Sequence, residues 1–62
     1  MKKLKAEIME WCSGQLYSVY MGTGRRGNIE TGNYKTKGLA KRAFISMCNR
    51  LGIDKSIYEF VD

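Results

Sequence analysis

The side chains that could do covalent or metal chemistry are few in this chain of 62 residues. It contains no histidine, and its two cysteines, Cys12 and Cys48, lie 36 positions apart. Zinc sites are normally built from closely spaced cysteine and histidine pairs, so neither a metal site nor a cofactor is expected. A nucleophile would lack its usual base, and Glu7, Glu10 and Glu30 do not form an identifiable acid pair. The sequence therefore predicts a protein that is not an enzyme and that works by binding.

One glycine-rich run has the spacing of a phosphate-binding loop. Residues Gly22 to Gly27 match GxGxxG. In a dinucleotide-binding fold, such glycines end a parallel strand and open a helix whose amides hold the pyrophosphate. Here a short extended segment follows instead, so we interpret the run as a hairpin tip. It would present Arg25 and Arg26 to a partner, and a merely solvated loop is the alternative.

Positive charge is concentrated in the first 53 residues. The whole chain has a net charge of +5, which divides into +7 for residues 1–53 and −2 for residues 54–62. A basic body attracts polyanions through long-range electrostatics and counterion release. Many small domains, however, carry a charge of about 2–8 for solubility alone.

The other candidate cations belong to two groups. Lys35, Lys37, Lys41 and Arg42 surround the predicted start of a helix, where positive charge opposes the helix dipole and lysines could hold phosphate beside the backbone amides. An ordinary solvated helix face is the alternative there. The second group is Lys3 and Lys5 on the first predicted strand, with Tyr20 and Ser18 on the same exposed side of the sheet and Tyr17, Val19 and Met21 facing inward.

The elements that must position these side chains begin with a predicted β-hairpin. Leu4 to Ile8 alternate between apolar and polar residues, as a half-buried strand does. Ser13-Gly14 is a turn signal, and the aromatic and β-branched run from Leu16 to Met21 forms the second strand. A short helix with Leu4, Ile8 and Trp11 on one face is the competing interpretation of the first segment.

A third strand and a helix follow. Ile29 to Tyr34 predicts a weaker strand in which Gly32 marks a bulge or a crowded backbone. Thr36 is the expected N-cap of a helix that ends near Leu51, with Gly52 as a left-handed cap. The apolar stripe expected to face the core of this helix consists of Leu39, Ala40, Ala43, Phe44, Met47 and Leu51.

The fold class expected for residues 1–62 is a single small α+β domain. It consists of a three-stranded antiparallel meander packed against one helix (βββα), with residues 54–62 as a short fourth strand or a packed tail. Ile57, Phe60 and Val61 are expected to be partly buried. Both cysteines are interpreted as reduced thiols of a cytoplasmic protein, because the N-terminus lacks the features of a secretory signal and no run is long enough for a membrane span.

The segment from Tyr34 to Phe44 resembles the strand-to-helix junction of several three-strand-plus-helix families. It is similar to the second helix of double-stranded-RNA-binding domains, which implies phosphate contacts for Lys37 and Lys41. The order of elements resembles the arm-site DNA-binding domain of phage-type integrases and the plant AP2-type domain. That resemblance implies readers on the outer sheet face: Lys3, Lys5, Ser18, Tyr20, Arg25 and Arg26. A third resemblance, to short bacterial ββα domains of unknown function, implies no activity.

These observations predict a non-enzymatic protein that binds nucleic acid through phosphates, with DNA favoured over RNA. The alternative is a small inhibitor or adaptor from a mobile element, of the phage anti-defence type, that binds a host protein or nucleoprotein complex. Its basis is a compact size without a catalytic domain and sheet edges that could pair with another chain. A homodimer through an edge strand is a further expectation, and no membrane partner is expected.

Overall fold

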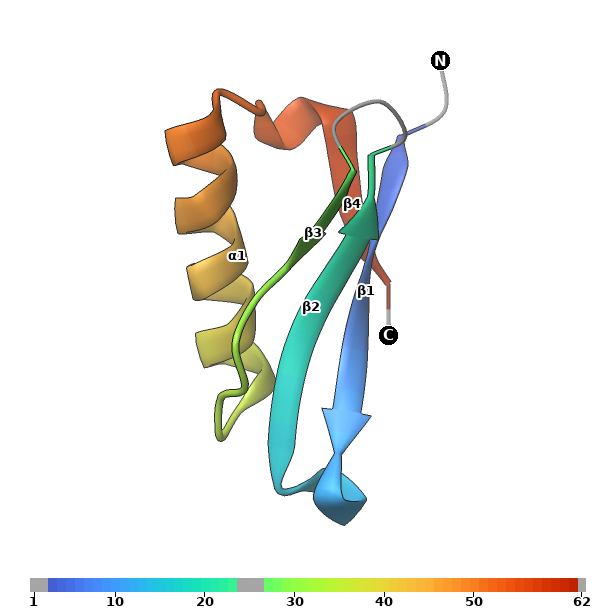
Figure 1. Cartoon of the computed structure of the whole chain (residues 1–62), viewed down its shortest axis with the longest axis vertical. Helices are drawn as coiled ribbons and strands as arrows, with labels where there is room; N and C mark the ends of the chain where they lie inside the picture. Colours follow the sequence, from blue (N-terminus) through green and yellow to red (C-terminus); the bar gives the residue numbers. More distant parts are fainter. Residues whose placement is uncertain (1–2, 24–26, 62) are drawn as a thin grey trace.

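The computed structural model describes residues 3–23 and 27–61 and has one helix packed on one face of a four-stranded sheet (Figure 1). The strand order is β3-β2-β1-β4, with β1 antiparallel to β2, β2 antiparallel to β3 and β1 parallel to β4. The α+β class and the antiparallel meander are confirmed, and the sheet as a whole is mixed. The elements in chain order are β1 (Leu4–Trp11), η1 (Cys12–Gly14), β2 (Leu16–Gly22), β3 (Asn28–Glu30), α1 (Lys37–Leu51), η3 (Lys55–Ile57) and β4 (Tyr58–Val61).

The first two strands form the predicted hairpin. β1 pairs with β2 from Glu7 opposite Tyr20 to Trp11 opposite Leu16. The strand interpretation of the N-terminal segment is therefore correct, and the competing helix is wrong. Alternation along β1 explains the outcome, because its even-numbered apolar residues all meet the core and its odd-numbered residues all lie on the far side.

The turn of this hairpin is a short left-handed segment. Cys12, Ser13 and Gly14 all have positive φ, at 54°, 54° and 89°. Only glycine adopts such a conformation without a steric cost, so two of the three residues are strained. The turn is closed by Gln15, whose backbone N–H donates to the carbonyls of Trp11 and Cys12 at 3.2 Å each.

The third strand is shorter than expected and is followed by a bulge. Only Asn28–Glu30 pairs regularly with β2, and the pairing resumes at an isolated bridge between Tyr17 and Tyr34. Three steps along β2, from Tyr20 to Tyr17, match four steps from Glu30 to Tyr34, so one extra residue is inserted. This bears out the predicted bulge around Gly32. A crowded backbone is not the reason for the glycine, because a Cβ there would meet nothing within 4 Å.

Both ends of α1 are capped as the sequence predicts. The Thr36 hydroxyl accepts a hydrogen bond from the Leu39 N–H at 3.1 Å. At the other end Gly52 has φ of 75°, its N–H donates to the Asn49 carbonyl at 3.2 Å, and the Ile53 N–H donates to the Cys48 carbonyl at 2.8 Å. These two bonds define a Schellman motif, which stops the helix and turns the chain back toward the sheet.

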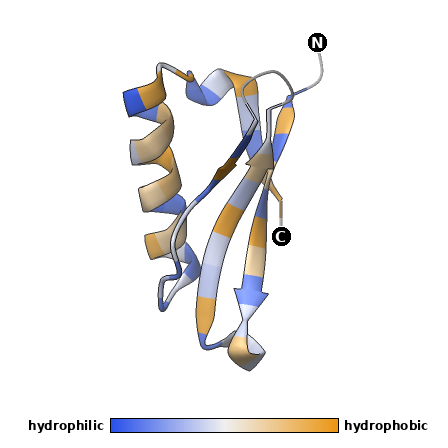
Figure 2. Cartoon of the chain, viewed as in Figure 1, coloured by the Kyte–Doolittle hydropathy of each residue, from blue (hydrophilic) through white to orange (hydrophobic). Residues whose placement is uncertain are grey.

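The core lies between α1 and the inner sheet face, and the alternating bands of hydropathy along the strands are visible in Figure 2. Val19 and Met21 are fully buried, as predicted for the inward face of β2. The buried residues of the core are Ala6, Val19, Met21, Ile29, Ala40, Phe44, Cys48, Ile53 and Tyr58.

The predicted helix stripe is only partly correct. Ala40 and Phe44 are fully buried, but Leu39 and Leu51 are 45% and 55% exposed, and the fully buried residue of the next turn is Cys48. The buried positions repeat every four residues, so the stripe follows one row along the helix. Leu39 lies outside that row, about 100° from Ala40 around the axis, and Leu51 lies where the chain leaves the helix.

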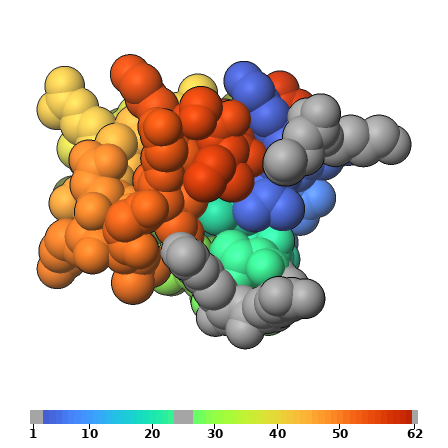
Figure 3. Space-filling model, turned by 90° about the horizontal axis from the view of Figure 1, so that it is seen from above, coloured from blue at the N-terminus to red at the C-terminus, as the bar shows by residue number. Residues whose placement is uncertain are grey.

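The C-terminal segment forms an edge strand rather than a loose tail. β4 pairs with β1, with Leu4 opposite Tyr58 and Ala6 opposite Phe60. The rings of Phe44, Tyr58 and Phe60 meet edge to face, with centroids 5.2 to 5.8 Å apart, and tie α1 to this edge of the sheet. The view along the long axis shows the η3 and β4 segment, in red, between α1 and β1 (Figure 3).

The predicted burial of the C-terminal segment is correct for two of its three residues. Phe60 and Val61 are half-buried, as expected, whereas Ile57 is 46% exposed. Tyr58 and Phe60 face the core. Neighbouring residues of a strand point to opposite faces, so Ile57, next to Tyr58, points away from the core.

Candidate nucleic-acid interface

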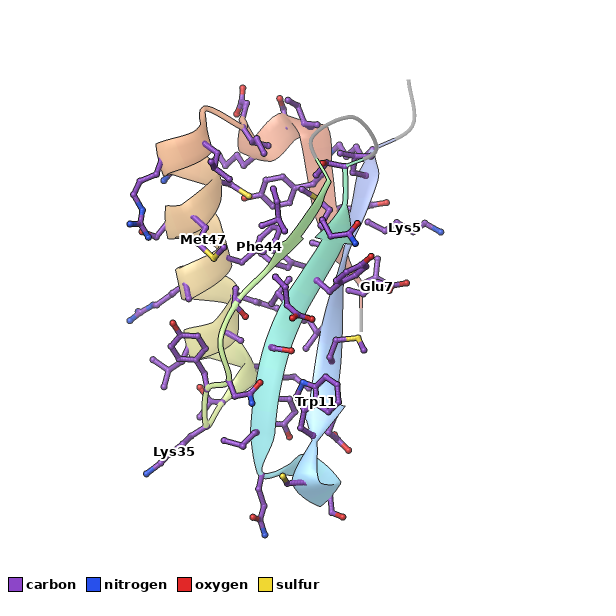
Figure 4. The ribbon with its side chains drawn as sticks, in the orientation of Figure 1. Lys5, Glu7, Trp11, Lys35, Phe44 and Met47 are labelled. Carbon is purple, nitrogen blue, oxygen red and sulfur yellow. The ribbon has the colours of Figure 1, made fainter. Side chains whose placement is uncertain are left out.

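The structure gathers four of the predicted cations around the first half of α1. Lys37, Lys41 and Arg42 lie on the helix, and Lys35 lies two residues before its first residue. We call this set the basic helix surface. Lys35, Lys37 and Arg42 are exposed, Lys41 is half-buried, and the side chain of Lys35 extends away from the fold (Figure 4).

Two of these lysines are positioned by aromatic rings of the sheet. The Lys37 ammonium lies 5.8 Å from the centroid of the Tyr17 ring, and that of Lys41 lies 5.4 Å from the centroid of Phe60. Such contacts hold the aliphatic part of a lysine against apolar surface while its charged end remains near solvent. Both lysines are one helical turn apart and therefore lie on the same side of α1.

The backbone amides at this helix end are partly occupied. Thr36 already accepts the Leu39 N–H, and the Ala40 N–H donates to the Thr36 carbonyl at 3.1 Å. The capacity of this region to hold an anion therefore depends mainly on its side chains. A tetrahedral phosphate needs several donors, and the lysine ammonium and arginine guanidinium groups supply them.

Lys3 and Lys5 do not join the basic helix surface. Lys5 alternates with the fully buried Ala6, so it lies on the sheet face away from α1, opposite Glu59 of β4. Figure 4 shows Lys5 and Lys35 on opposite sides of the fold and near opposite ends. Lys3 precedes β1 and is exposed at the same end as Lys5. The predicted cations are thus divided between at least two surfaces.

Tyr20 lies on the outer sheet face, as predicted, but between acidic residues. It is half-buried and pairs with Glu7 of β1 on one side and Glu30 of β3 on the other. Carboxylates on both sides repel a phosphate backbone, so this tyrosine is badly placed to stack on a nucleic-acid base. The two glutamates are separated by the tyrosine, so they lie two strands apart in the sheet.

Arg25 and Arg26 lie outside the described residues. The ends of their loop are joined, because the Thr23 N–H donates to the Gly27 carbonyl at 3.1 Å and the Thr23 hydroxyl also donates to that carbonyl. The GxGxxG run joins two antiparallel strands, β2 and β3, so the helix required by a dinucleotide site does not follow it.

Ser18 departs from its expected exposure. It lies on the outer sheet face but is only 1% exposed, because Trp11 covers it and donates its indole N–H to the Ser18 hydroxyl at 2.8 Å. The predicted face of Ser18 is correct, since Ser18 alternates with Val19. The cover was missed because Trp11 is near Ser18 only through the strand register, which residue types alone do not specify.

Neither cysteine belongs to the basic helix surface. Both thiols are free, with Cys12 exposed and Cys48 buried in the core. Burial raises the pKa of the Cys48 thiol, an effect that its hydrogen bond to Tyr58 partly offsets, and burial together with the adjacent thiol raises the pKa of Tyr58. Neutral, protonated forms are therefore favoured at both positions.

The described residues contain neither a candidate metal site nor a helix that could span a membrane. Over residues 3–23 and 27–61, no group of three or more His, Cys, Asp or Glu residues could hold a metal ion. None of the helices in that part of the chain is long and apolar enough to cross a bilayer. Comparison with family models, curated proteins and solved structures found no match for this chain.

Proposed function

We propose that this protein binds nucleic acid without enzymatic activity, and that it holds the phosphate backbone on the basic helix surface. The observation that carries the proposal is the charge of α1. The helix has four cationic residues, Lys37, Lys41, Arg42 and Arg50, and no acidic residue, and Lys35 immediately precedes its cap. A polyanion would meet these charges along one element of the fold.

The electrostatics within the helix support this proposal. The first turn contains no acidic residue, although a carboxylate there would stabilise the helix dipole by about 0.3–1 kcal/mol. Lys37 and Lys41 form a like-charged i, i+4 pair, which costs about 0.2–0.5 kcal/mol in an isolated helix. The contacts of Lys37 with Tyr17 and of Lys41 with Phe60 offset part of these costs. A first turn that has positive side chains and no carboxylate favours an anionic ligand at this end of α1.

The outer sheet face is not the proposed contact. The charged residues within its strands are Lys5, Glu7, Glu30 and Glu59, a net charge of −2, and Lys3 lies before β1. A phosphate backbone would be repelled there. The proposal therefore places the contact on the helix, as the resemblance to double-stranded-RNA-binding domains implies. It does not use the outer-sheet residues that the integrase and AP2-type resemblances imply.

The class of nucleic acid is the open part of the proposal. Backbone contacts are shared by DNA and RNA, so duplex DNA, duplex RNA and single strands should all be compared. We favour duplex DNA as the first ligand, because two of the resembling families bind it. Binding would be largely independent of sequence, since lysine and arginine contacts to phosphate carry no base information.

The test is the salt dependence of binding, measured by fluorescence anisotropy with a labelled duplex. Four phosphate contacts predict a slope of log K against log salt of about −3.6. The double variant Lys41→Ala plus Arg42→Ala should flatten the slope by about 1.8, and Lys5→Ala should leave it unchanged. Absence of affinity for any duplex or single strand at low salt would refute the proposal, as would an equal effect of the Lys5 variant.

The glycine-rich loop has its own test. The variant Arg25→Ala plus Arg26→Ala removes the other predicted cationic cluster without touching α1. If the loop also contacts phosphates, the wild-type slope will be steeper than four contacts allow and this variant will reduce it by about 1.8. An unchanged slope would restrict the interface to the helix.

A further inference from the structure

No helix of the described residues covers the sheet face away from α1, which has an apolar strip along the β1 and β2 hairpin. Met9 and Trp11 of β1 lie opposite Ser18 and Leu16 of β2, and Tyr20 continues the strip toward β3. Trp11 is 43% exposed, and Met9, Leu16 and Tyr20 are half-buried. Figure 4 shows Trp11 and Glu7 on the side of the sheet away from Phe44 and the helix.

Trp11 is held in place before any partner arrives. Its indole N–H donates to the hydroxyl of Ser18, a residue that is 1% exposed, at 2.8 Å. The ring therefore lies across β1 and β2 as a fixed aromatic surface, with its polar atom already satisfied. Rigid tryptophans with a large contact area dominate the energy of many protein interfaces, because little side-chain entropy is lost on binding.

Acidic residues border this strip. Glu30, Tyr20, Glu7 and Val61 form one row across all four strands, and Glu59 lies opposite Lys5 in the next row. The charged residues within the strands of this face sum to −2, whereas Lys35 and α1 together have a net charge of +5. The two sides of the protein therefore differ in the sign of their charge.

We propose that the outer sheet face binds an amphipathic segment of a protein partner in which lysine or arginine residues flank apolar side chains. The apolar side chains would pack on Trp11, Met9 and Leu16, and the cations would meet Glu7 and Glu30. This contact is separate from the basic helix surface, so one molecule could hold a polyanion and a basic protein segment at the same time. The protein would then act as an adaptor between them.

The charges argue against the other occupants of this face. A second copy docked face to face would bring together two faces that each carry Glu7, Glu30 and Glu59. A nucleic acid or an anionic membrane surface would be repelled by the same carboxylates. A basic amphipathic segment is the occupant whose charge and apolar surface both fit.

The experiment uses two peptides with the same leucine pattern, one with lysine and one with glutamate at the polar positions. Trp11 is the only tryptophan, so its emission reports on this face directly. The lysine peptide should shift the emission to shorter wavelength and bind at least tenfold more tightly than the glutamate peptide. Equal binding of the two peptides, or no change in emission with the lysine peptide, would overturn the proposal.

Variants, measured with a labelled lysine peptide, locate the contact. Trp11→Ala should weaken binding about 30-fold, as expected for a central aromatic residue. Leu39→Ala, which removes an apolar side chain of similar exposure from the helix side, should have no effect. Glu30→Gln should weaken binding about two- to fivefold, whereas Glu10→Gln, on the opposite side of β1, should not. Equal effects of Trp11→Ala and Leu39→Ala would refute the assignment.

Two further readouts separate this inference from the other outcomes. Sedimentation should show a monomer at the concentrations used, because a dimer abolished by Trp11→Ala would mean that a second copy covers the face. Trp11→Ala should leave the affinity for duplex DNA unchanged, so the two contacts succeed or fail separately. A circular dichroism spectrum like that of the wild type would show that each variant is folded.

Discussion

Thr31 lies in the bulge that follows β3, and replacing it should be the most informative test of stability. Its hydroxyl accepts a hydrogen bond from the Val19 N–H and donates one to the Gly32 carbonyl, each at 2.9 Å. In a regular antiparallel pair a backbone carbonyl would accept the Val19 N–H. The side chain of Thr31 thus replaces the acceptor that the extra residue of the bulge displaces.

The expected loss of stability on replacing Thr31 follows from burial. Thr31 is 6% exposed and Val19 is fully buried, so Thr31→Val keeps the shape but leaves the Val19 N–H without its partner away from water. An unsatisfied buried donor costs about 1–3 kcal/mol. A domain of this length has a net stability of roughly 3–5 kcal/mol, so the variant should lose a large part of it. Each kcal/mol lowers the melting temperature by about 4–8 °C.

The assay is urea denaturation followed by circular dichroism, together with amide hydrogen exchange at Val19. Thr31→Ser is the control, because it keeps both hydrogen bonds and loses one methyl group, at a cost of about 0.8 kcal/mol. We expect Thr31→Val to be the less stable variant and to accelerate exchange at Val19. A valine variant that is as stable as the serine variant, with unchanged exchange, would refute the role assigned to the hydroxyl.

Further predictions concern backbone conformation and ionisation. Gly52→Ala should lower the free energy of unfolding by about 1 kcal/mol, because φ is 75° there, whereas Gly32→Ala should be neutral or stabilising; thermal melts of both test this contrast. Ser13 has φ of 54°, a left-handed conformation that costs a non-glycine residue about 1 kcal/mol. Ser13→Gly should remove this cost and raise the melting temperature. Burial raises the folded-state pKa of Cys48 and Tyr58, so the stability that they contribute is complete below their unfolded pKa values and is lost above them. Urea midpoints should therefore fall as pH rises above about 8.5, and a flat alkaline profile would contradict this.

The ends of the helix could be predicted from the sequence because local chemistry determines them. Thr36 and Gly52 act through atoms within a few residues along the chain, so their roles do not depend on the rest of the fold. The same is true of the alternation that identified β1 and the inward face of β2. Each of these features is encoded by residue type and spacing alone.

The features that the sequence did not determine depend on packing between distant segments. Leu39 satisfies the helical spacing of an apolar stripe, yet the position of the sheet selects the row of Ala40, Phe44 and Cys48. β4 has four residues and weak alternation, and its phase is fixed by parallel pairing with β1 and by contact with Phe44. Periodicity gives a set of compatible faces, and tertiary contacts choose among them.

The candidate interface was predictable only in part for the same reason. Four of the cations are neighbours in sequence: Lys35, Lys37, Lys41 and Arg42. Their proximity follows from the start of α1 and the residues just before it. Whether Lys5 belongs with them depends on which sheet face the helix covers. The acidic border of the outer face was missed because its carboxylates come from three strands that are brought together only by the register of the sheet.

The net charge of the chain therefore describes its charge distribution poorly. A value of +5 would suit a uniformly basic protein, but the described residues combine a strongly basic helix side with a mildly acidic sheet face. An electrostatic field of this kind orients an approaching polyanion toward α1 and turns the tryptophan strip away from it. In the proposed arrangement the apolar face would stay available while a polyanion occupies the helix, which is the physical requirement for the proposed adaptor.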